Sequence, residues 1–332
     1  MKMPDCMNYI QITEPGGPEV LKLAHAPVPE PGEREVLIKV HAAGVNRPDV
    51  IQRMGNYPMK PGMSSVPGLE VAGKVIRVGA SVTGFKVGDN VCALTNGGGY
   101  AEYCAVVESQ VLPIPDGLDM IHAAAIPETF FTVWANLFEL GHARKGSTVL
   151  IHGGTSGIGT TALMLCKAFG IKAYATAGSQ EKCEQIRALG GKAINYRDAD
   201  FAQVIAQDTQ NKGVDVILDI MGGSYFESNV NSLARRGRLV IIGFLGGSHI
   251  EHFNLLALAE KQATVTGSMM RSRSEEEKAE IARALTKHIW PLLDNGGCAP
   301  IIDRVFPLAE APRAHQRMEQ GEHIGKIVLE VL

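Results

Sequence analysis

Short apolar runs separated by turn residues fill the first third of the chain, and this pattern is typical of β-strands. The runs cover residues 36–40, 71–78, 90–94 and 100–107, and glycines separate several of them. Three prolines stand just before the first run, so that segment cannot be the interior of a helix. Many short strands with turns between them predict a small, barrel-like all-β domain.

The pattern changes near Asp119, where longer helix-like segments begin to alternate with short apolar runs. Such alternation predicts a parallel sheet that is covered by helices on both faces. The expected helices are 121–140, 159–169 and 180–189, and the expected strands are 148–151, 172–176, 214–219, 238–243 and 263–267.

The C-terminal part contains one further helix signal and one further strand signal. Ser274 and Glu277 have the spacing of a capping box, which predicts a helix that runs towards Trp290. The apolar tail at residues 326–331 predicts a last strand, which we expect to rejoin the β-rich lobe.

Composition limits the class of protein. With 332 residues, two domains are expected, and a net charge of −3 argues against binding to nucleic acid or to a membrane surface. No apolar stretch reaches the length of about 18 residues that a membrane span needs, and the N-terminus lacks the apolar core of a signal peptide. The six cysteines are scattered without a CxxC pair, so we expect a reducing, cytoplasmic location.

A glycine-rich turn lies between the expected strand at 148–151 and the helix that follows it. Its glycines allow backbone N–H groups to approach a pyrophosphate, while the helix N-terminus adds a partial positive charge. The residues expected to hold the phosphates are Gly154, Thr155, Ser156, Gly157, Ile158 and Gly159.

Three other kinds of site contain similar glycine-rich turns. The spacing of this turn is not a strict G-x-G-x-x-G, so a purely structural turn is the alternative. A P-loop would need a lysine after Gly159, where Thr160 stands. A nucleophile elbow would need the final glycine one position after Gly157, so Ser156 is interpreted as a turn residue.

The end of the next strand indicates which nucleotide binds. An NAD site usually places an acidic residue there, but this chain has Gly178 and Ser179, with Lys182 following. A small hydroxyl residue leaves room for a 2′-phosphate, and a charge-assisted bond from a lysine is worth about 1.5–3 kcal/mol. NADPH is therefore favoured over NADH. The structural alternatives are a helix cap for Ser179 and a solvated helix face for Lys182.

At this point the sequence resembles a known family over nearly its whole length. The motifs that carry the resemblance are EVLIKV at 35–40, AGVNRPD at 43–49, FKVGD at 85–89, AAAIPE at 123–128, the glycine turn, AGS at 177–179 with Lys182, NY at 195–196, GGSY at 222–225 and GKIVL at 325–329. They are similar to the zinc-independent, zeta-crystallin-like quinone oxidoreductases of the medium-chain dehydrogenase/reductase superfamily. Within that branch the chain looks closest to the p53-inducible quinone oxidoreductase group.

The resemblance implies an α/β fold with a GroES-like β-barrel lobe and a doubly wound, parallel-sheet Rossmann lobe. Residues 1–125 and 270–332 would form the GroES-like catalytic and substrate domain, and residues 126–269 the Rossmann NADPH-binding domain. The family also implies a cofactor cleft between the lobes and a homodimer that pairs the edge strand at 263–267, which covers an otherwise open sheet edge.

Site residues follow from the resemblance, motif by motif. Asn46, Tyr57 and Thr132 would lie near the nicotinamide, with Tyr57 and Asn46 as the catalytic residues. The other cofactor-binding positions that it implies are Ser179, Lys182 and Tyr196 around the 2′-phosphate, Gly243, Phe244 and Leu245 beside the nicotinamide ribose, and Lys326 as a further contact. The structural alternatives are a turn cap for Asn46, a packed loop aromatic for Tyr57 and an edge-strand residue for Tyr196.

No metal site is expected. Zinc-dependent alcohol dehydrogenases of the superfamily carry a cysteine and a histidine where this chain has Val45-Asn46 and Leu69, the latter next to Glu70. Without a Lewis acid, alcohol oxidation loses its usual route. Quinones and activated alkenes are already electrophilic and need less help.

The sequence therefore predicts an NADPH-dependent quinone oxidoreductase with direct hydride transfer, in which Tyr57 donates a hydrogen bond or a proton. An NADPH-dependent enoyl or 2-alkenal reductase is the main alternative. A short-chain dehydrogenase is excluded, because no tyrosine is followed four positions later by lysine. An NADPH-gated non-enzymatic or RNA-binding protein is disfavoured by the missing basic-aromatic run.

Overall fold

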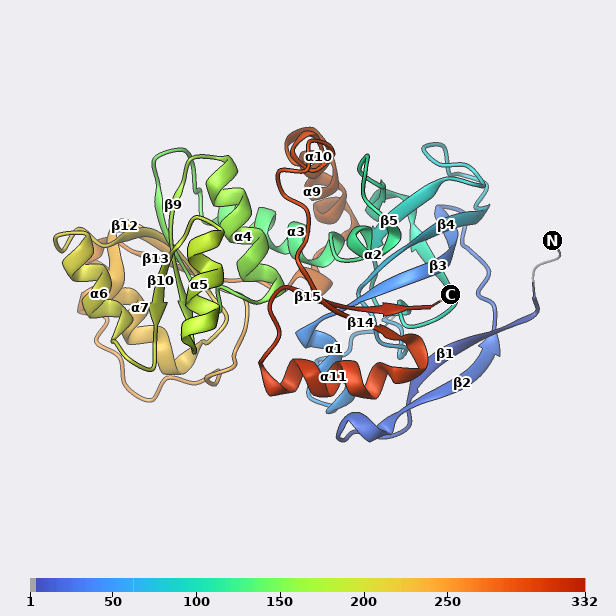
Figure 1. Ribbon diagram of the computed structural model, residues 1–332, viewed down its shortest axis with the longest axis horizontal. Coiled ribbons are helices and arrows are strands. Elements are labelled where there is room, and N and C mark those ends of the chain that lie inside the picture. Colours follow the sequence, from blue (N-terminus) through green and yellow to red (C-terminus); the bar gives the residue numbers. More distant parts are fainter. Residues whose placement is uncertain (1–3, 62, 332) are drawn as a thin grey trace. The chain divides into compact units, whose positions relative to one another are not determined.

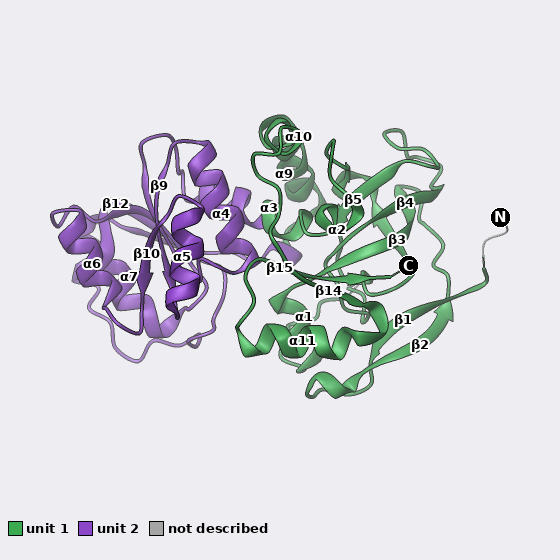
Figure 2. Ribbon diagram, in the orientation of Figure 1, with its two compact units in different colours: residues 1–131, 273–332 green, residues 132–272 purple. Residues whose placement is uncertain are grey.

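The computed structural model of the protein describes residues 4–61 and 63–331. Its contacts divide the chain into two compact units (Figure 2). Unit 1 comprises Met1–Phe131 and Arg273–Leu332, and unit 2 comprises Thr132–Ser272. The boundaries that the sequence predicts stand at 125/126 and 269/270.

Unit 1 is built on a seven-stranded sheet with an additional two-stranded hairpin among the described residues. The hairpin pairs β1 (Cys6–Ile12) with β2 (Leu21–Pro27). The strands of the larger sheet are β3 (Glu35–Val45), β4 (Glu70–Val78), β5 (Asn90–Leu94), β6 (Tyr103–Val107), β7 (Val111–Pro113), β14 (Ile302–Pro307) and β15 (Lys326–Glu330).

The long strand β3 organises this sheet. It pairs with β4 and β6 and also with β15, so that Val45 lies opposite Ile327. Apolar side chains of β3, including Val36, Ile38 and Val40, are fully buried in the core of the unit. The expected return of the C-terminal strand to the first lobe is therefore confirmed, and it brings Lys326 next to the end of β3.

The helices of unit 1 lie outside the sheet (Figure 1). They are α1 (Arg47–Arg53), α2 (Met120–Ala123), α9 (Glu275–His288), α10 (Trp290–Asp294) and α11 (Ala311–Gln320), while α3 (Pro127–Val133) runs across the boundary into unit 2. The capping box at the start of α9 is confirmed, since the Glu277 N–H donates to Ser274 Oγ at 3.2 Å and the Ser274 N–H donates to Glu277 Oε2 at 2.8 Å.

Unit 2 has the parallel sheet that the alternating pattern predicts. Its strands are β8 (Thr148–Ile151), β9 (Lys172–Ala177), β10 (Lys192–Asn195), β11 (Val214–Asp219), β12 (Leu233–Ile241) and β13 (Thr264–Gly267). Its α-helices are α4 (Gly157–Ala168), α5 (Gln180–Ala188), α6 (Phe201–Asp208), α7 (Phe226–Ser232) and α8 (Leu256–Lys261).

The strand order β10-β9-β8-β11-β12-β13 is that of a dinucleotide-binding Rossmann sheet. The chain reverses its direction of progress between β8 and β11, which are neighbours. In such sheets ligands bind outside the carboxyl ends of the strands at this switch point. The fold prediction is confirmed, and the glycine turn follows directly on β8.

The prediction of a single helix at 121–140 is wrong in detail, because this segment is divided into three parts. α2 ends at Ala123, α3 begins at Pro127, and a wider π-helical segment follows at Trp134–Leu140. Proline disfavours helical backbone in the residue before it but fits the first helical position, so Pro127 starts a new helix. The sequence pattern also missed β1, β2, β7, β10 and β14. No described helix combines the length and apolar character needed to cross a bilayer.

Candidate functional site

The turn after β8 is held by its own serine and by the packing of its glycines. Ser156 is the N-cap of α4, and its Oγ accepts from the Gly159 N–H at 3.0 Å and donates to the Gly153 carbonyl at 2.8 Å. Gly153 has φ +70°, and a Cβ on Gly154 would lie 2.6 Å from the Ala175 Cβ. Only glycine fits both positions.

The geometry of this turn suits an anionic ligand. The first N–H groups of a helix have no intrahelical acceptor, and the helix dipole favours negative charge at the same end. Thr155 is buried and Ile158 is half-buried, so their contribution at the surface of the turn comes from the backbone. A pyrophosphate fits this arrangement.

His152, the residue before the turn, stabilises it through buried hydrogen bonds. The sequence did not indicate this role. The Nε2 of His152 lies 2.7 Å from Asn229 Oδ1 and its Nδ1 lies 3.1 Å from Thr176 Oγ1. The same hydroxyl accepts from the Gly153 N–H at 3.2 Å. Burial lowers the pKa of His152 to about 4, so the ring is neutral and links β8, β9 and α7.

The residues expected around a 2′-phosphate gather at the carboxyl ends of β9 and β10, which are neighbours in the sheet. Ser179 is the N-cap of α5, and its Oγ accepts from the Lys182 N–H at 3.3 Å. Tyr196 follows β10, is 46% exposed, and places its hydroxyl against Gly178, where a Cβ would clash. The capping alternative for Ser179 is therefore confirmed, and it is compatible with phosphate binding.

The segment after β12 lies on the other side of the switch point, beside the end of β11. Phe244 and Leu245 are 53% and 52% exposed, and the Leu245 N–H donates to the Ile220 carbonyl at 3.0 Å. Asp219, at the end of β11, accepts from the N–H groups of Met221 at 2.8 Å and Gly222 at 2.9 Å. Burial raises the pKa of Asp219 to about 6.

Thr132 on α3 carries an isolated polar atom. Its side chain is 7% exposed, and its Oγ1 has no hydrogen-bond partner among the described residues. A buried hydroxyl without a partner loses roughly 1–3 kcal/mol of hydrogen bonding, so any group that bonded it would recover part of that free energy.

A cluster of charged and polar groups lies inside unit 1, around Asn46 at the end of β3. The Asn46 Nδ2 donates to Glu70 Oε1 at 2.9 Å, and Lys326 Nζ donates to Asn46 Oδ1 at 2.6 Å. Lys326 also lies 2.6 Å from Glu70 Oε1 and donates to the Val45 carbonyl at 3.0 Å. We call Asn46, Glu70, Lys326 and Glu128 the buried cluster.

Each member of the buried cluster is at least nine-tenths buried. Lys326 has three oxygen partners, which is as many as an ammonium group can serve. Glu70 is bound on both oxygens, because its Oε2 accepts from the Glu128 N–H at 2.8 Å. The ammonium therefore fixes the orientation of the Asn46 amide.

A chain of buried groups continues from Asn46 towards the surface of unit 1. Asp49 accepts from the Asn46 N–H at 2.9 Å and from the Tyr100 hydroxyl at 3.0 Å. That hydroxyl lies 3.1 Å from His315 Nε2, and Arg53 pairs with Glu319 through two bonds of 2.8 Å. Burial raises the pKa of Asp49 to about 6, and burial and Arg53 lower the pKa of His315 to about 3.

Tyr57 lies in the loop after α1 and is half-buried. The Met59 N–H donates to its carbonyl at 2.8 Å. Its role near a nicotinamide stays a prediction.

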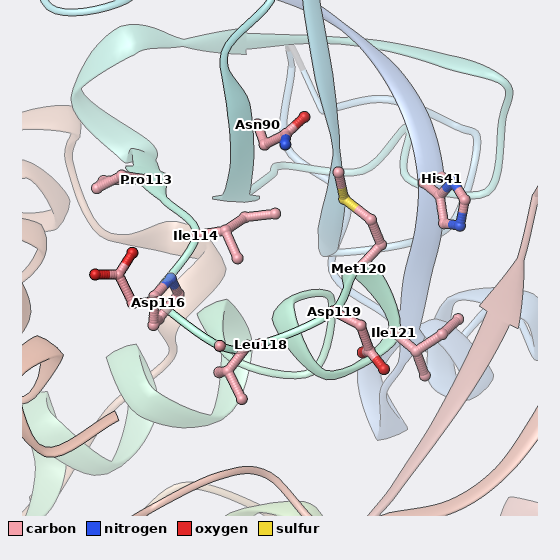
Figure 3. Close-up of a pocket in the computed structure, with 11 residues that line it drawn as sticks. His41, Asn90, Pro113, Ile114, Asp116, Leu118, Asp119, Met120 and Ile121 are labelled. Atoms are coloured by element: carbon pink, nitrogen blue, oxygen red, sulfur yellow. The ribbon is translucent and has the colours of Figure 1, made fainter. Parts of the chain in front are cut away.

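A cavity of about 590 Å³ in unit 1 is separate from these groups (Figure 3). His41, Asn90, Ile114, Asp119 and Met120 are among its lining residues. None of the predicted site residues lines it. In the described part of the chain, no group of three or more His, Cys, Asp or Glu side chains is arranged to hold a metal ion.

Comparison with known proteins adds to this geometry. A family model described as "Alcohol dehydrogenase GroES-like domain" matches residues 32–116, and one described as "Zinc-binding dehydrogenase" matches residues 157–286. The quinone oxidoreductase of Rattus norvegicus is 34% identical over 327 residues, which are 97% of this chain and 97% of the relative. The chain belongs to the quinone oxidoreductase family. The quinone oxidoreductase of Homo sapiens is 32% identical over the same shares of both chains.

Solved structures of this family agree with the fold. The Escherichia coli quinone oxidoreductase complexed with NADPH has a TM-score of 0.86 at 28% identity, and the match covers 98% of this chain and all of that one. A quinone oxidoreductase of Pseudomonas syringae has a TM-score of 0.87 at 28% identity with the same coverage. Within this family, the present chain has Asn46 and Leu69 where the zinc-dependent pattern of the superfamily calls for zinc ligands.

Proposed function

We propose that this protein is an NADPH-dependent quinone oxidoreductase that needs no zinc. The assignment of NADPH as the cofactor rests on the residues at the carboxyl ends of β9 and β10. The positions directly after β9 are Gly178 and Ser179, with no acidic residue to bond a ribose 2′-OH, and Lys182 and Tyr196 lie nearby. The proposal that the substrate is a quinone rests on the family, whose members match this chain over nearly their whole length.

The described residues fit NADPH. The turn from Gly154 to Gly159 would hold the pyrophosphate, and Ser179, Lys182 and Tyr196 the 2′-phosphate. Gly243 to Leu245 would lie beside the nicotinamide ribose. The partnerless hydroxyl of Thr132 supplies a hydrogen-bonding group for the nicotinamide end. On this assignment residues 126–269 form the NADPH-binding domain, and residues 1–125 and 270–332 form the acceptor domain.

Bound NADPH supplies a hydride, and the chain contributes orientation and exclusion of water. We assign this orienting role to Asn46, a residue of unit 1 whose amide is held at both ends by Lys326 and Glu70. Lys326 then acts on the cofactor through Asn46, since its own three partners are protein oxygens. Tyr57 donates a hydrogen bond to the acceptor.

Quinones are favoured over enones because a quinone accepts a hydride without a Lewis acid or a strong oxyanion site. A steady-state screen tests this with ortho-quinones, para-quinones and 2-alkenals, each with NADPH and with NADH. We expect the highest kcat/KM for quinones with NADPH. A higher kcat/KM for 2-alkenals would establish the double-bond reductase instead.

We also place the protein in the cytoplasm as a homodimer. The edge strand β13 exposes Val265, and the nearby helix α8 begins with exposed Leu256 after exposed Leu255. An apolar sheet edge of this kind is normally covered. Sedimentation should give a dimer, and Val265→Lys should give monomers that still bind NADPH. A monomeric wild-type protein would refute the pairing.

A further inference from the structure

Glu128 is a buried carboxyl group that the assignments above leave without a task. It is the second residue of α3 and is 9% exposed. Its backbone N–H donates to Glu70, but its carboxyl oxygens make no hydrogen bond to any residue that the structure describes. A carboxylate is rarely buried in this way unless it is paired or protonated.

The neighbouring Glu70 shows the opposite situation. Its two oxygens receive the Asn46 amide, the Lys326 ammonium and the Glu128 N–H. Three donors stabilise Glu70 as the ion, whereas Glu128 has no donor and faces a negative charge. When two carboxyl groups have such different surroundings, the proton belongs on the one without donors.

The charges around Glu128 agree with this assignment. Burial, followed by the charge of Glu70, raises the pKa of Glu128 to about 8, and Asp49 acts in the same direction. Lys326 and Lys278 oppose the shift but do not cancel it. Lys278 itself donates to Asn96 at 2.6 Å. The missing donors and the neighbouring negative charges thus both favour the protonated form of Glu128 at neutral pH.

Glu128 and Thr132 both lie on α3, one helical turn apart. Residues four apart lie on the same face of a helix, and Thr132 is four residues after Glu128. Thr132 has the partnerless hydroxyl assigned to the nicotinamide end. On its other side, Glu128 is tied through Glu70 to Asn46, the second residue assigned to that end.

We propose that Glu128 is the catalytic acid that protonates the reduced acceptor, a role that rests on the proposed quinone reduction. A hydride carries two electrons and one proton to the quinone and leaves one oxygen as an anion. The O–H bond of Glu128 breaks, and a new O–H bond forms on that oxygen to give the hydroquinone. Glu128 remains as a carboxylate, and water returns its proton before the next turnover.

The kinetic test compares Glu128→Gln with the wild type. At pH 7 we expect kcat for simple naphthoquinones to fall about 100-fold, which is typical for loss of a general acid. Wild-type kcat should decrease above pH about 8 as Glu128 ionises, and this decrease should be absent in the variant. A halogenated quinone, whose hydroquinone is acidic enough to leave as an anion, should be reduced by both proteins at similar rates.

Two measurements without turnover accompany the kinetics. The infrared spectrum of the cofactor-free protein at pH 7 should contain the carbonyl band of a buried protonated carboxyl, and Glu128→Gln should remove it. Since the pKa of Glu128 in the folded protein lies above the ordinary glutamate value of 4.5, the wild type should lose stability as pH rises from about 4.5 to 8. The melting temperature of Glu128→Gln should not show this loss.

The control is Glu227→Gln, because Glu227 is also the second residue of a helix, α7, but is exposed. It should change none of these quantities. If wild type reduces quinones and Glu128→Gln does so equally at every pH, Glu128 is not the acid, although the proposed function stands. If the alkaline decrease disappears in Tyr57→Phe instead, the acid is Tyr57. If wild type reduces no quinone, the proposed function itself fails.

Discussion

The phosphate-binding turn of unit 2 and the buried cluster of unit 1 are both polar sites, but they are built in different ways. The turn is a continuous segment whose geometry comes from backbone N–H groups, one capping serine and glycines packed against β9. The buried cluster takes side chains from segments far apart, with Lys326 and Asn46 separated by 280 positions. The turn therefore depends on the absence of side chains, and the cluster depends on the charge of each member.

This difference has a consequence for stability. A side chain beside the turn that binds the cofactor, such as Lys182 on α5, can be removed with a loss of affinity but little loss of folding free energy. A cluster of buried ions loses folding free energy when one partner is removed, because an uncompensated charge remains. The variants below separate these two responses.

The largest effect is expected from Lys326→Met, which leaves Glu70 buried without its counter-ion. Breaking such a pair costs about 3–5 kcal/mol of unfolding free energy. Trp290 lies in unit 1 and Trp134 in unit 2, so urea unfolding followed by fluorescence in a Trp134→Phe background reports unit 1.

Two controls accompany this variant. Lys192→Met breaks a surface pair with Asp208 and should cost less than about 1 kcal/mol. The double variant Glu70→Gln with Lys326→Met should be more stable than Lys326→Met alone, because no charge is then left unpaired. An equal loss from the two lysine variants would contradict the role of the buried cluster.

An intermediate effect is expected from Lys182→Met at the start of α5. Loss of a charge-assisted bond of about 1.5–3 kcal/mol should weaken NADPH binding roughly 10- to 100-fold and leave NADH binding unchanged. Calorimetric titration measures both affinities. Lys172→Met is the matched control, since Lys172 is the first residue of β9 and lies at the opposite end of that strand. Equal weakening of NADPH and NADH would show that Lys182 does not bind the 2′-phosphate.

The smallest effect is expected from Thr132→Val. Because the Thr132 hydroxyl has no partner in the described structure, its removal should leave the cofactor-free protein as stable as before, or more so. NADPH affinity should fall by about 1 kcal/mol, as for one hydrogen bond. Thr129→Val on the same helix is the control with the opposite expected result, because the Thr129 hydroxyl donates to the Ala125 carbonyl at 3.1 Å. It should lose stability and keep its NADPH affinity.

The comparison also explains what the sequence could and could not predict. The glycine turn and the capping box of α9 depend on neighbouring residues, so their spacing was sufficient to predict them, and the alternation of helices and strands was sufficient to predict the parallel sheet of unit 2. Ser179 could be placed for the same reason. The break before α3 was a local signal as well, since Pro127 marked it, but the apolar character of the surrounding segment obscured it.

Contacts between distant segments could not be predicted in this way. Asn46 and Lys326 were recognised only through family motifs, and nothing in either motif indicates that the ammonium binds the amide. Glu128 is the last residue of the AAAIPE motif, but its lack of donors depends on how Glu70 and Lys326 pack. His152 was missed because its partners, Thr176 and Asn229, are 24 and 77 positions away.

Reduction of quinones with NADPH and without a metal ion is the function proposed for this protein. The most direct test is a stoichiometric reaction of chelator-treated, metal-free protein with NADPH and a naphthoquinone, with metal content verified by mass spectrometry. We predict that one hydroquinone forms for each NADPH consumed, at the rate of the untreated protein. Loss of activity on chelation, with recovery on addition of zinc, would contradict the account.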